Sequence, residues 1–247
     1  MAVATIPPAP PPTVKRHGEL NAFFADFSSD ALIARLMEIG LEDDYYSHEA
    51  KHLAHARGEA SFGEILVALH ERSTRDVFDA AVPLLTNADP SVRIIGILIL
   101  RELGTWGERP LFPEHWELFR ELVALESDLA VVRALASAYS FMSGSEAVDM
   151  MVEFSRHSDY EIRSAVAFSI CNCGPMNDPR IVEVQLALAG DDDADVRGSA
   201  VYDFMENITL DNQIVRDMLF TALNDEDEKV REYATRALNA RGISVEA

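Results

Sequence analysis

The residues best suited to chemistry are His48, Glu49 and His52, which spell a literal HExxH motif. On a helix, histidines four residues apart lie one turn apart on the same face, where both could bind zinc while Glu49 acts as general base. His55 extends this face by a further turn. The residue types and their spacing therefore fit a metal-dependent hydrolase.

The surroundings of the motif do not fit such an enzyme. Zinc hydrolases of this kind place the motif helix beneath a β-sheet that binds substrate, and no segment of this sequence alternates as a strand would. The extended motif HExxHxxGxxH needs Gly where His55 stands. Apolar Leu53 and Ala56 predict that a neighbouring face packs inward and leaves the histidines on the polar side. We therefore expect no catalytic residues, cofactor or metal, and keep a metal site at His48, His52 and His55 as the open alternative.

Two cysteines and an acidic run are the other groups with chemical potential. Cys171 and Cys173 are one residue apart, and a helix points such side chains about 200° apart. We expect them to be small core residues rather than a disulfide or a metal site. Residues 191–195 have the composition of a calcium loop but lack the Gly and the distal Glu of an EF-hand, so we interpret these acids as helix caps and solubilising charge.

The chain is strongly acidic, with 42 Asp and Glu against 21 Lys and Arg in 247 residues. The excess runs through both halves: residues 1–125 carry 19 acidic and 11 basic groups, and residues 126–247 carry 23 and 10. Such a field repels a phosphate backbone and attracts a basic protein surface, which argues against nucleic-acid binding. The alternative is that the charge only keeps the molecule in solution.

The sequence suggests neither a membrane nor a secreted location. The longest apolar run, residues 94–100, is far shorter than the roughly 18 residues that a membrane helix needs. The first thirteen residues lack the basic and apolar regions of a secretory signal. We therefore expect a cytoplasmic protein with no membrane partner.

An internal repeat organises most of the chain. Five segments align on an arginine that follows Val or Ile, at intervals of 40, 30, 34 and 34 residues: Arg93, Arg133, Arg163, Arg197 and Arg231. An Asp lies four or five residues before each arginine, and a small or β-branched residue lies three after it. In four copies a Gly lies eleven after it. This repeat length is typical of stacked helix pairs.

Each element of the repeat has a physical role in a helix pair. The Asp caps the start of the second helix, and the Gly ends that helix where a positive φ is needed. The small residue lets a neighbouring helix approach closely. A first amphipathic helix is expected before each Asp, over residues 76–86, 114–125, 146–155, 178–189 and 212–223. The predicted fold is all-α, a right-handed α-solenoid of about six antiparallel helix pairs with an N-terminal helical cap.

The recurring start D-x-x-V-R, as at residues 193–197, and the closing Gly resemble the HEAT-like repeats of bacterial proteins. These include the group named after phycobilisome lyases and an uncharacterised family of short HEAT-repeat proteins. The resemblance covers about residues 74–242 and implies a binding habit without an agreed activity. In such families the Asp and Arg usually form a ladder between repeats, which implies that the five repeat arginines are structural.

The first 73 residues are less regular. Residues 6–12 form a proline-rich stretch of polyproline II type, so we expect a flexible tail over residues 1–16. Helices are expected over 19–27, 30–39, 43–57 and 61–72, and Ser61 with Glu64 forms a capping box for the last. We assign residues 17–73 to an N-terminal helical cap with a degenerate first repeat, and residues 74–247 to the HEAT-like repeat domain.

A partner surface is predicted on the second helices, which line the concave face of HEAT solenoids. If the residues one before, three after and seven after each arginine face the core, those two, six and nine after it form another stripe. Its mixture of apolar, aromatic and acidic residues is typical of protein recognition, and the candidates are Ile99, Glu102, Tyr139, Met142, Asn172, Asp203, Glu206 and Tyr233. The alternative is that its apolar members pack beneath the N-terminal region.

These features favour a non-enzymatic interaction module that binds a basic or mixed protein partner on an acidic concave face. An immunity or inhibitor protein, or an adaptor, would fit this description. The alternative class is an enzyme or enzyme subunit: a lyase-like chaperone or, with less support, a metal-dependent hydrolase that uses residues 48–52. The charge and fold class carry this preference.

Overall fold

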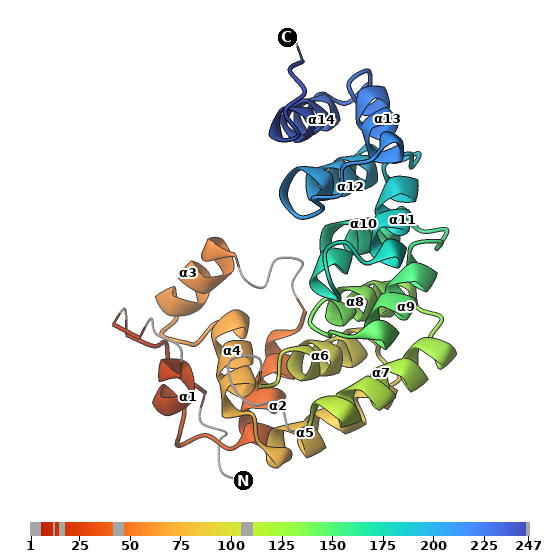
Figure 1. Cartoon of the computed structure of the whole chain (residues 1–247). Coiled ribbons are helices and arrows are strands. Elements are labelled where there is room, and N and C mark those ends of the chain that lie inside the picture. The colour runs from red at the N-terminus through yellow and green to blue at the C-terminus, as the bar shows by residue number, and fades with distance from the viewer. Residues whose placement is uncertain (1–5, 12, 15–17, 42–46, 105–110, 246–247) are drawn as a thin grey trace. The chain divides into compact units, whose positions relative to one another are not determined.

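The computed structural model describes residues 6–11, 13–14, 18–41, 47–104 and 111–245. The chain divides into two compact units, Met1–Ala134 and Leu135–Ala247. Regular structure in the described residues is helical (Figure 1), apart from one isolated bridge between Pro8 and Glu59, so the all-α prediction is confirmed. None of the helices among these residues is long and apolar enough to cross a membrane.

The first unit opens with four helices that precede the repeat arginines. They are α1 (Glu19–Phe23), α2 (Ser29–Ile39), α3 (His48–Ala56) and α4 (Phe62–Arg72). The predicted capping box on α4 is present, because Ser61 Oγ accepts the Glu64 N–H and the Glu64 carboxylate accepts the Ser61 N–H. Helix α1 ends four residues before its predicted end, and the predicted start of α3 lies in residues 42–46, outside the described residues.

Residues 6–11, within the segment expected to be a flexible tail, lie against the turn that follows α3. The Ala9 N–H donates to the Gly58 carbonyl oxygen at 3.0 Å, and the Ala60 N–H donates to the Pro7 carbonyl oxygen at 3.0 Å. Pro7 and Pro10 are buried. An extended proline-rich strand keeps its carbonyl oxygens available for pairing, so these residues are held in place, contrary to the expectation of a free tail.

The rest of the first unit begins the regular repeats. It contains α5 (Arg75–Ala81) with the 3₁₀ turn η1 (Val82–Thr86), α6 (Pro90–Arg101), α7 (Phe112–Leu125) and the start of α8 (Leu129–Tyr139). Helix α6 is largely enclosed, since eight consecutive residues from Ile94 to Arg101 are buried. A Cβ at Gly96 would lie 2.9 Å from Leu84 Cβ, so the predicted close approach at the small residue is confirmed in this copy.

The second unit continues the alternation of first and second helices. It contains α9 (Ser145–Phe154), α10 (Tyr160–Ser169), α11 (Pro179–Leu188), α12 (Ala194–Glu206), α13 (Gln213–Ala222) and α14 (Glu228–Ala240). Within this unit α12 packs between α10 and α14, while α11 and α13 pack along the other side of these helices (Figure 1). Its core includes Val201, Phe204, Leu219 and Val230. The first helices, α9, α11 and α13, match their predicted ranges to within two residues.

Two of the predicted helix-ending glycines in the second unit show different roles. Gly144 has the predicted positive φ, 120°, but it directly precedes α9 instead of ending α8 at Tyr139. Gly174 has no positive φ, and a Cβ there would lie 3.0 Å from Val148 Cγ2. Gly174 is therefore required by close packing rather than by backbone conformation.

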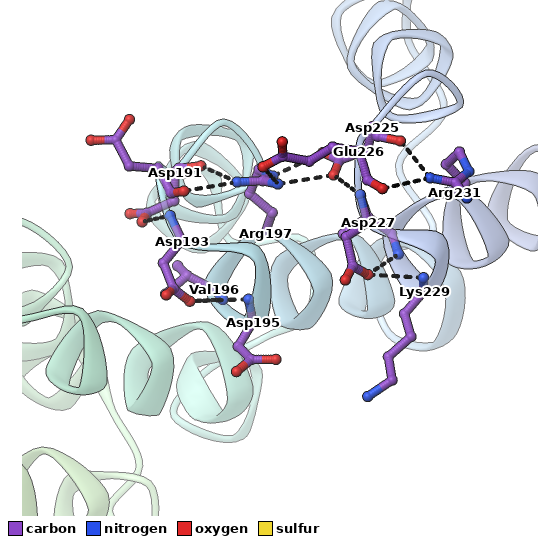
Figure 2. Close-up of polar contacts among 12 residues, drawn as sticks. Asp191, Asp193, Asp195, Val196, Arg197, Asp225, Glu226, Asp227, Lys229 and Arg231 are labelled. Atoms are coloured by element: carbon purple, nitrogen blue, oxygen red, sulfur yellow. Dashed lines mark hydrogen bonds and ion pairs between the residues drawn. The ribbon is translucent and has the colours of Figure 1, made fainter.

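Arg93, Arg163 and Arg197 form the ladder that the resemblance implies, and Figure 2 shows the contact made by Arg197. Arg197 donates from Nε and Nη2 to the two carboxylate oxygens of Asp225 at 2.8 and 2.9 Å. Its Nη1 donates to the carbonyl oxygens of Asp191 and Asp192 at 2.9 and 3.0 Å. The same bidentate ion pair joins Arg163 to Asp191 and Arg93 to Glu126. Each of these side chains thus joins the turn before its own helix to the corresponding turn of the next repeat.

The ladder acid is not the capping Asp but the residue two positions before it. Asp193 and Asp227 cap α12 and α14 by accepting backbone N–H groups of the first turn, as predicted. Asp191 and Asp225 accept the N–H of the capping residue and the guanidinium of the preceding repeat (Figure 2). That guanidinium lowers the pKa of both carboxyl groups. The acidic runs at residues 191–195 and 225–228 therefore hold adjacent repeats together.

Candidate functional site

Four of the eight predicted partner-binding residues are buried. Ile99 and Tyr139 are 0% exposed, and Met142 is 1% exposed, so the prediction is wrong for these three. Asp203 is 2% exposed, but it lies at the edge of a groove in the second unit. The other four retain exposed surface: Asn172 and Glu206 are exposed, and Glu102 and Tyr233 are partly exposed.

Helix geometry explains why the predicted stripe fails. At about 100° per residue, the residue six after each arginine lies only about 20° from the β-branched core residue just before the arginine. The sixth residue therefore shares the buried face, and it is buried in all five copies: Ile99, Tyr139, Ser169, Asp203 and Ala237. The residues two before, and two, five and nine after, the arginine lie on the opposite side of the helix. In α12 these are Asp195, Ser199, Tyr202 and Glu206, none of which is buried.

Asp195, Ser199 and Tyr202 of this stripe line a groove of about 640 Å³ over α10, α12 and α14, whereas Glu206 does not. The groove lies wholly within the second unit, between helices that pack directly on one another. Its lining comprises Ser164, Phe168, Asn172, Ala194, Asp195, Gly198, Ser199, Tyr202, Asp203, Asn207, Asp227, Lys229 and Tyr233. The volume is within the range of about 300–1,000 Å³ that ligand sites occupy.

Three aromatic side chains from successive repeats converge on this groove. Phe168 on α10 is 77% exposed, and Tyr202 on α12 is 40% exposed. Tyr233 on α14 stands edge-on to Tyr202, with ring centroids 5.3 Å apart and an interplanar angle of 72°. Phe168 and Tyr202 occupy the fifth position after the arginine, so they were absent from the predicted stripe. Aromatic residues are enriched at recognition surfaces because they offer large contact area at low entropic cost.

Asp203 is the buried acidic residue of the groove lining. Its carboxylate accepts hydrogen bonds from Gln185 Nε2 and, at 2.6 Å, from Asn207 Nδ2. Burial raises the pKa of Asp203, although the hydrogen bonds from Cys171, Asn207 and Gln185 act in the opposite direction. A carboxyl group held by neutral donors in a desolvated place is unusual, and it marks this groove as a candidate functional site.

The exposed polar residues of the groove carry a net negative charge. Asp195 is exposed at the start of α12, and Asp227 caps α14. Lys229 is the basic residue of the lining, and its side chain extends away from the ladder in Figure 2. The groove therefore combines an aromatic wall, a buried carboxyl group and an acidic rim, which fits recognition of a cationic group.

The HExxH segment lies on α3, and His55, which follows the motif on this helix, contacts Glu64. His55 Nε2 lies 2.9 Å from Glu64 Oε2, and Lys51 Nζ lies 2.9 Å from Glu64 Oε1. Burial alone would raise the pKa of Glu64, but the hydrogen bonds from Ser61, His55 and Lys51 outweigh it and lower this pKa. His48 and His52 are exposed. Among the described residues no group of three or more His, Cys, Asp or Glu side chains is placed to hold a metal ion.

The predicted packing of this helix is wrong in detail. Leu53 is 53% exposed and Ala56 is exposed, whereas Ala54 is 5% exposed and packs inward. The helix is therefore rotated from the expected orientation. This orientation agrees with two polar contacts, because Lys51 and His55 both reach the buried Glu64 carboxylate of α4.

The two cysteines are free thiols, as expected for core residues. Cys173 is buried, and its Sγ donates to the Tyr139 carbonyl oxygen at 3.4 Å. Burial raises the pKa of Cys173 to about 12 and also raises that of Cys171. A thiol with a raised pKa is a poor nucleophile at neutral pH, so neither cysteine fits a catalytic role.

The fold is that of a helical repeat protein, with an open groove in its second unit. No family model matches the sequence, and no curated protein matches it.

Solved structures show the same fold. The chain is similar to YibA of Escherichia coli, with a TM-score of 0.60 and 19% identity over 87% of this chain and 76% of that one. Two engineered proteins match with TM-scores of 0.54 and 0.52, each at 19% identity, over 93% and 86% of this chain and 98% of each of theirs. At this level of identity the similarity shows the fold alone.

Proposed function

We propose that this helical repeat protein is a non-enzymatic binding module, and that the groove over α10, α12 and α14 holds a basic segment of a protein partner. The observation that carries the proposal is the convergence of Phe168, Tyr202 and Tyr233 with carboxyl groups on a single groove of about 640 Å³. Aromatic anchors surrounded by polar residues are the usual centre of a protein-recognition surface.

The charge of the second unit supports a basic partner. Residues 135–247 contain 21 Asp and Glu but only 9 Lys and Arg. Seven of these nine cations are already bonded within the unit: Arg163, Arg180, Arg197, Arg216, Arg231, Arg236 and Arg241. These arginines already bond to carboxylates or carbonyl oxygens of the unit, so the charge that remains available to a partner is mainly acidic. Such a field steers basic surfaces toward it and disfavours nucleic acid.

An inhibitor or immunity protein for a cationic target, or an adaptor for a basic partner, would use such a groove. In these roles the groove binds without altering its ligand, so no catalytic group is required. The raised pKa values of both thiols agree with this reading.

Selection from a random peptide library on the purified protein tests the proposal. We expect enrichment of peptides that contain Lys or Arg, and their affinities can be measured by fluorescence anisotropy. Replacing Phe168 and Tyr202 together by Ala should weaken binding about tenfold or more, as the loss of two aromatic anchors typically does.

A matched double variant separates this groove from general acidity. Ile214 and Phe220 are 65% and 44% exposed on α13, outside the groove lining. Replacing both by Ala removes a similar exposed apolar area and should leave peptide affinity unchanged. A library without basic enrichment, or equal losses in the two double variants, would contradict the proposal.

A further inference from the structure

We propose that the groove contains a pocket for one ammonium group, the side chain of a partner's lysine, placed over Asp203 and walled by Phe168, Tyr202 and Tyr233. The inference rests on the proposed function and names the group that the groove recognises. Its starting point is that all four residues line the same groove while only Asp203 among them is buried.

Asp203 is a buried carboxyl group with neutral hydrogen-bond partners. Gln185 and Asn207 each donate to one of its two oxygens. Among the described residues, no Lys, Arg or His side chain forms an ion pair with it, although the unit is rich in arginine. A desolvated carboxylate without a counter-charge is costly, and a bound cation would remove that cost.

The aromatic rings supply the walls that an organic cation needs. Tyr202 and Tyr233 meet at 72° and both line the groove, and Phe168, which is 77% exposed, lines it from the neighbouring helix. The negative face of an aromatic ring attracts a cation, and a desolvated site strengthens that attraction. The alkyl part of a lysine would also cover the exposed ring surface.

The hydrogen bonds already made by Asp203 favour an ammonium over a guanidinium group. A bidentate arginine needs two free carboxylate oxygens in one plane, and here each oxygen already accepts a bond from a side-chain amide. An ammonium acts as a point charge and can approach on the remaining lone pairs. We therefore assign the pocket to lysine.

Lys229 lies in the same lining and competes electrostatically with a bound cation. Its side chain is exposed at the first turn of α14, where its backbone N–H is held by the Asp227 cap. Lys229→Gln should therefore strengthen ammonium binding about two- to fivefold, as removal of one exposed like charge at short range does.

Titration of ¹⁵N-labelled full-length protein with Nα-acetyl-lysine N-methylamide tests the pocket directly. We expect saturable shifts confined to amides of α10, α12 and α14. The norleucine analogue, which has the same length without charge, should bind at least about tenfold more weakly. The arginine analogue should not bind more tightly than the lysine analogue, and tighter binding would overturn the assignment to ammonium.

Variants locate the site. Asp203→Asn should weaken binding of the lysine analogue about tenfold, and Tyr202→Leu should weaken it several-fold. Asp217 is an exposed residue of α13, so Asp217→Asn removes the same charge and should have no effect. Tyr202→Leu keeps the test informative if Asp203→Asn disturbs folding. Equal affinity of the parent and Asp203→Asn, or shifts outside these three helices, would overturn the pocket.

The two proposals can fail separately. If library-selected basic peptides depend on Phe168 and Tyr202 but lose nothing in Asp203→Asn, the binding function stands and the lysine pocket is wrong. If the lysine analogue binds as described but no basic peptide is selected, the pocket stands and the protein-binding role is wrong.

Discussion

Helices α6 and α12 occupy equivalent places in the repeat, yet α6 is enclosed and α12 lines an open groove. In α6 the residues five and six after the arginine, Leu98 and Ile99, are 3% and 0% exposed. In α12 the fifth residue, Tyr202, is 40% exposed, and the sixth, Asp203, is a buried carboxyl group at the groove. The difference lies in what covers the fifth position.

The cap helices cover α6 in the first unit. Helices α2 and α4 both pack on α6, and His70 Nε2 of α4 lies 2.8 Å from the Leu98 carbonyl oxygen. Helix α12 packs on α10, α11 and α14, and this arrangement leaves the groove open. The part of the predicted stripe that lies on α6, with Ile99, is therefore core beneath α2 and α4, and the candidate binding surface lies in the second unit.

The strongest test of this contrast replaces one large apolar residue in each unit. Ile99→Ala should lower the free energy of unfolding by about 2–4 kcal/mol, because it leaves a cavity in an enclosed helix. Phe168→Ala should cost less than about 1 kcal/mol, because the ring is 77% exposed. Urea unfolding followed by circular dichroism measures both. Similar losses would mean that Phe168 is covered and that the groove is closed.

The ladder provides a second contrast within the open unit. Arg197→Ala removes a bidentate ion pair to Asp225 and two backbone contacts, and should cost about 2–3 kcal/mol because the partner acid and carbonyls lose their donor. Arg236→Ala removes an exposed pair with Glu232 at 3.6 Å and should cost less than about 0.5 kcal/mol. Thermal unfolding of both variants gives the comparison, and a small loss for Arg197→Ala would remove the ladder as a source of stability.

Two glycines sharpen the comparison between enclosed and open helices. A Cβ at Gly96 in α6 would lie 2.9 Å from Leu84 Cβ, so Gly96→Ala should cost about 1–2 kcal/mol. At Gly198 in α12 the nearest atom would be Val230 Cγ2 at 3.8 Å, an ordinary contact. Gly198→Ala should therefore stabilise the protein by about 0.5–1 kcal/mol through helix propensity. The two midpoints in urea should move in opposite directions, and movement in the same direction would contradict the difference in packing.

The repeat could be predicted from the sequence because its signals are local. Capping aspartates such as Asp193 bond to residues two and three positions away, and core positions recur with the helical period. The ladder partner of Arg163 lies 28 residues away, yet it could also have been found, because an acid two positions before the capping Asp recurs at Asp191 and Asp225.

The site was harder to predict, for two different physical reasons. The predicted stripe assigns the sixth position after the arginine to the open face, whereas helix geometry alone places that position on the buried face. Whether Leu98 or Tyr202 is covered, however, depends on which helices pack over the fifth position. The residues around each arginine do not determine that packing. The orientation of α3 also depended on a distant contact, the buried Glu64 carboxylate.

The smallest expected effect concerns the pH dependence of stability at Asp203. Burial raises the pKa of the Asp203 carboxyl in the folded protein. The stability that the protonated carboxyl contributes is therefore fully present below the unfolded-state pKa of about 3.9. It is lost as pH rises through the folded-state pKa. Asp203→Asn cannot ionise at this position, so the free energy of unfolding of this variant relative to that of the parent should increase as pH rises from about 4 to 8. Thermal unfolding at the two pH values measures this change, with Asp217→Asn on exposed α13 as the charge-matched control.

A difference that stays constant with pH would mean that Asp203 ionises without cost and that water reaches it in the folded state. Asp203 would then be solvated, and α12 would differ from α6 at the sixth position after the arginine as well as at the fifth. A difference that grows with pH would instead place the boundary between core and groove at this carboxyl, where a bound cation gains most from replacing the missing counter-charge.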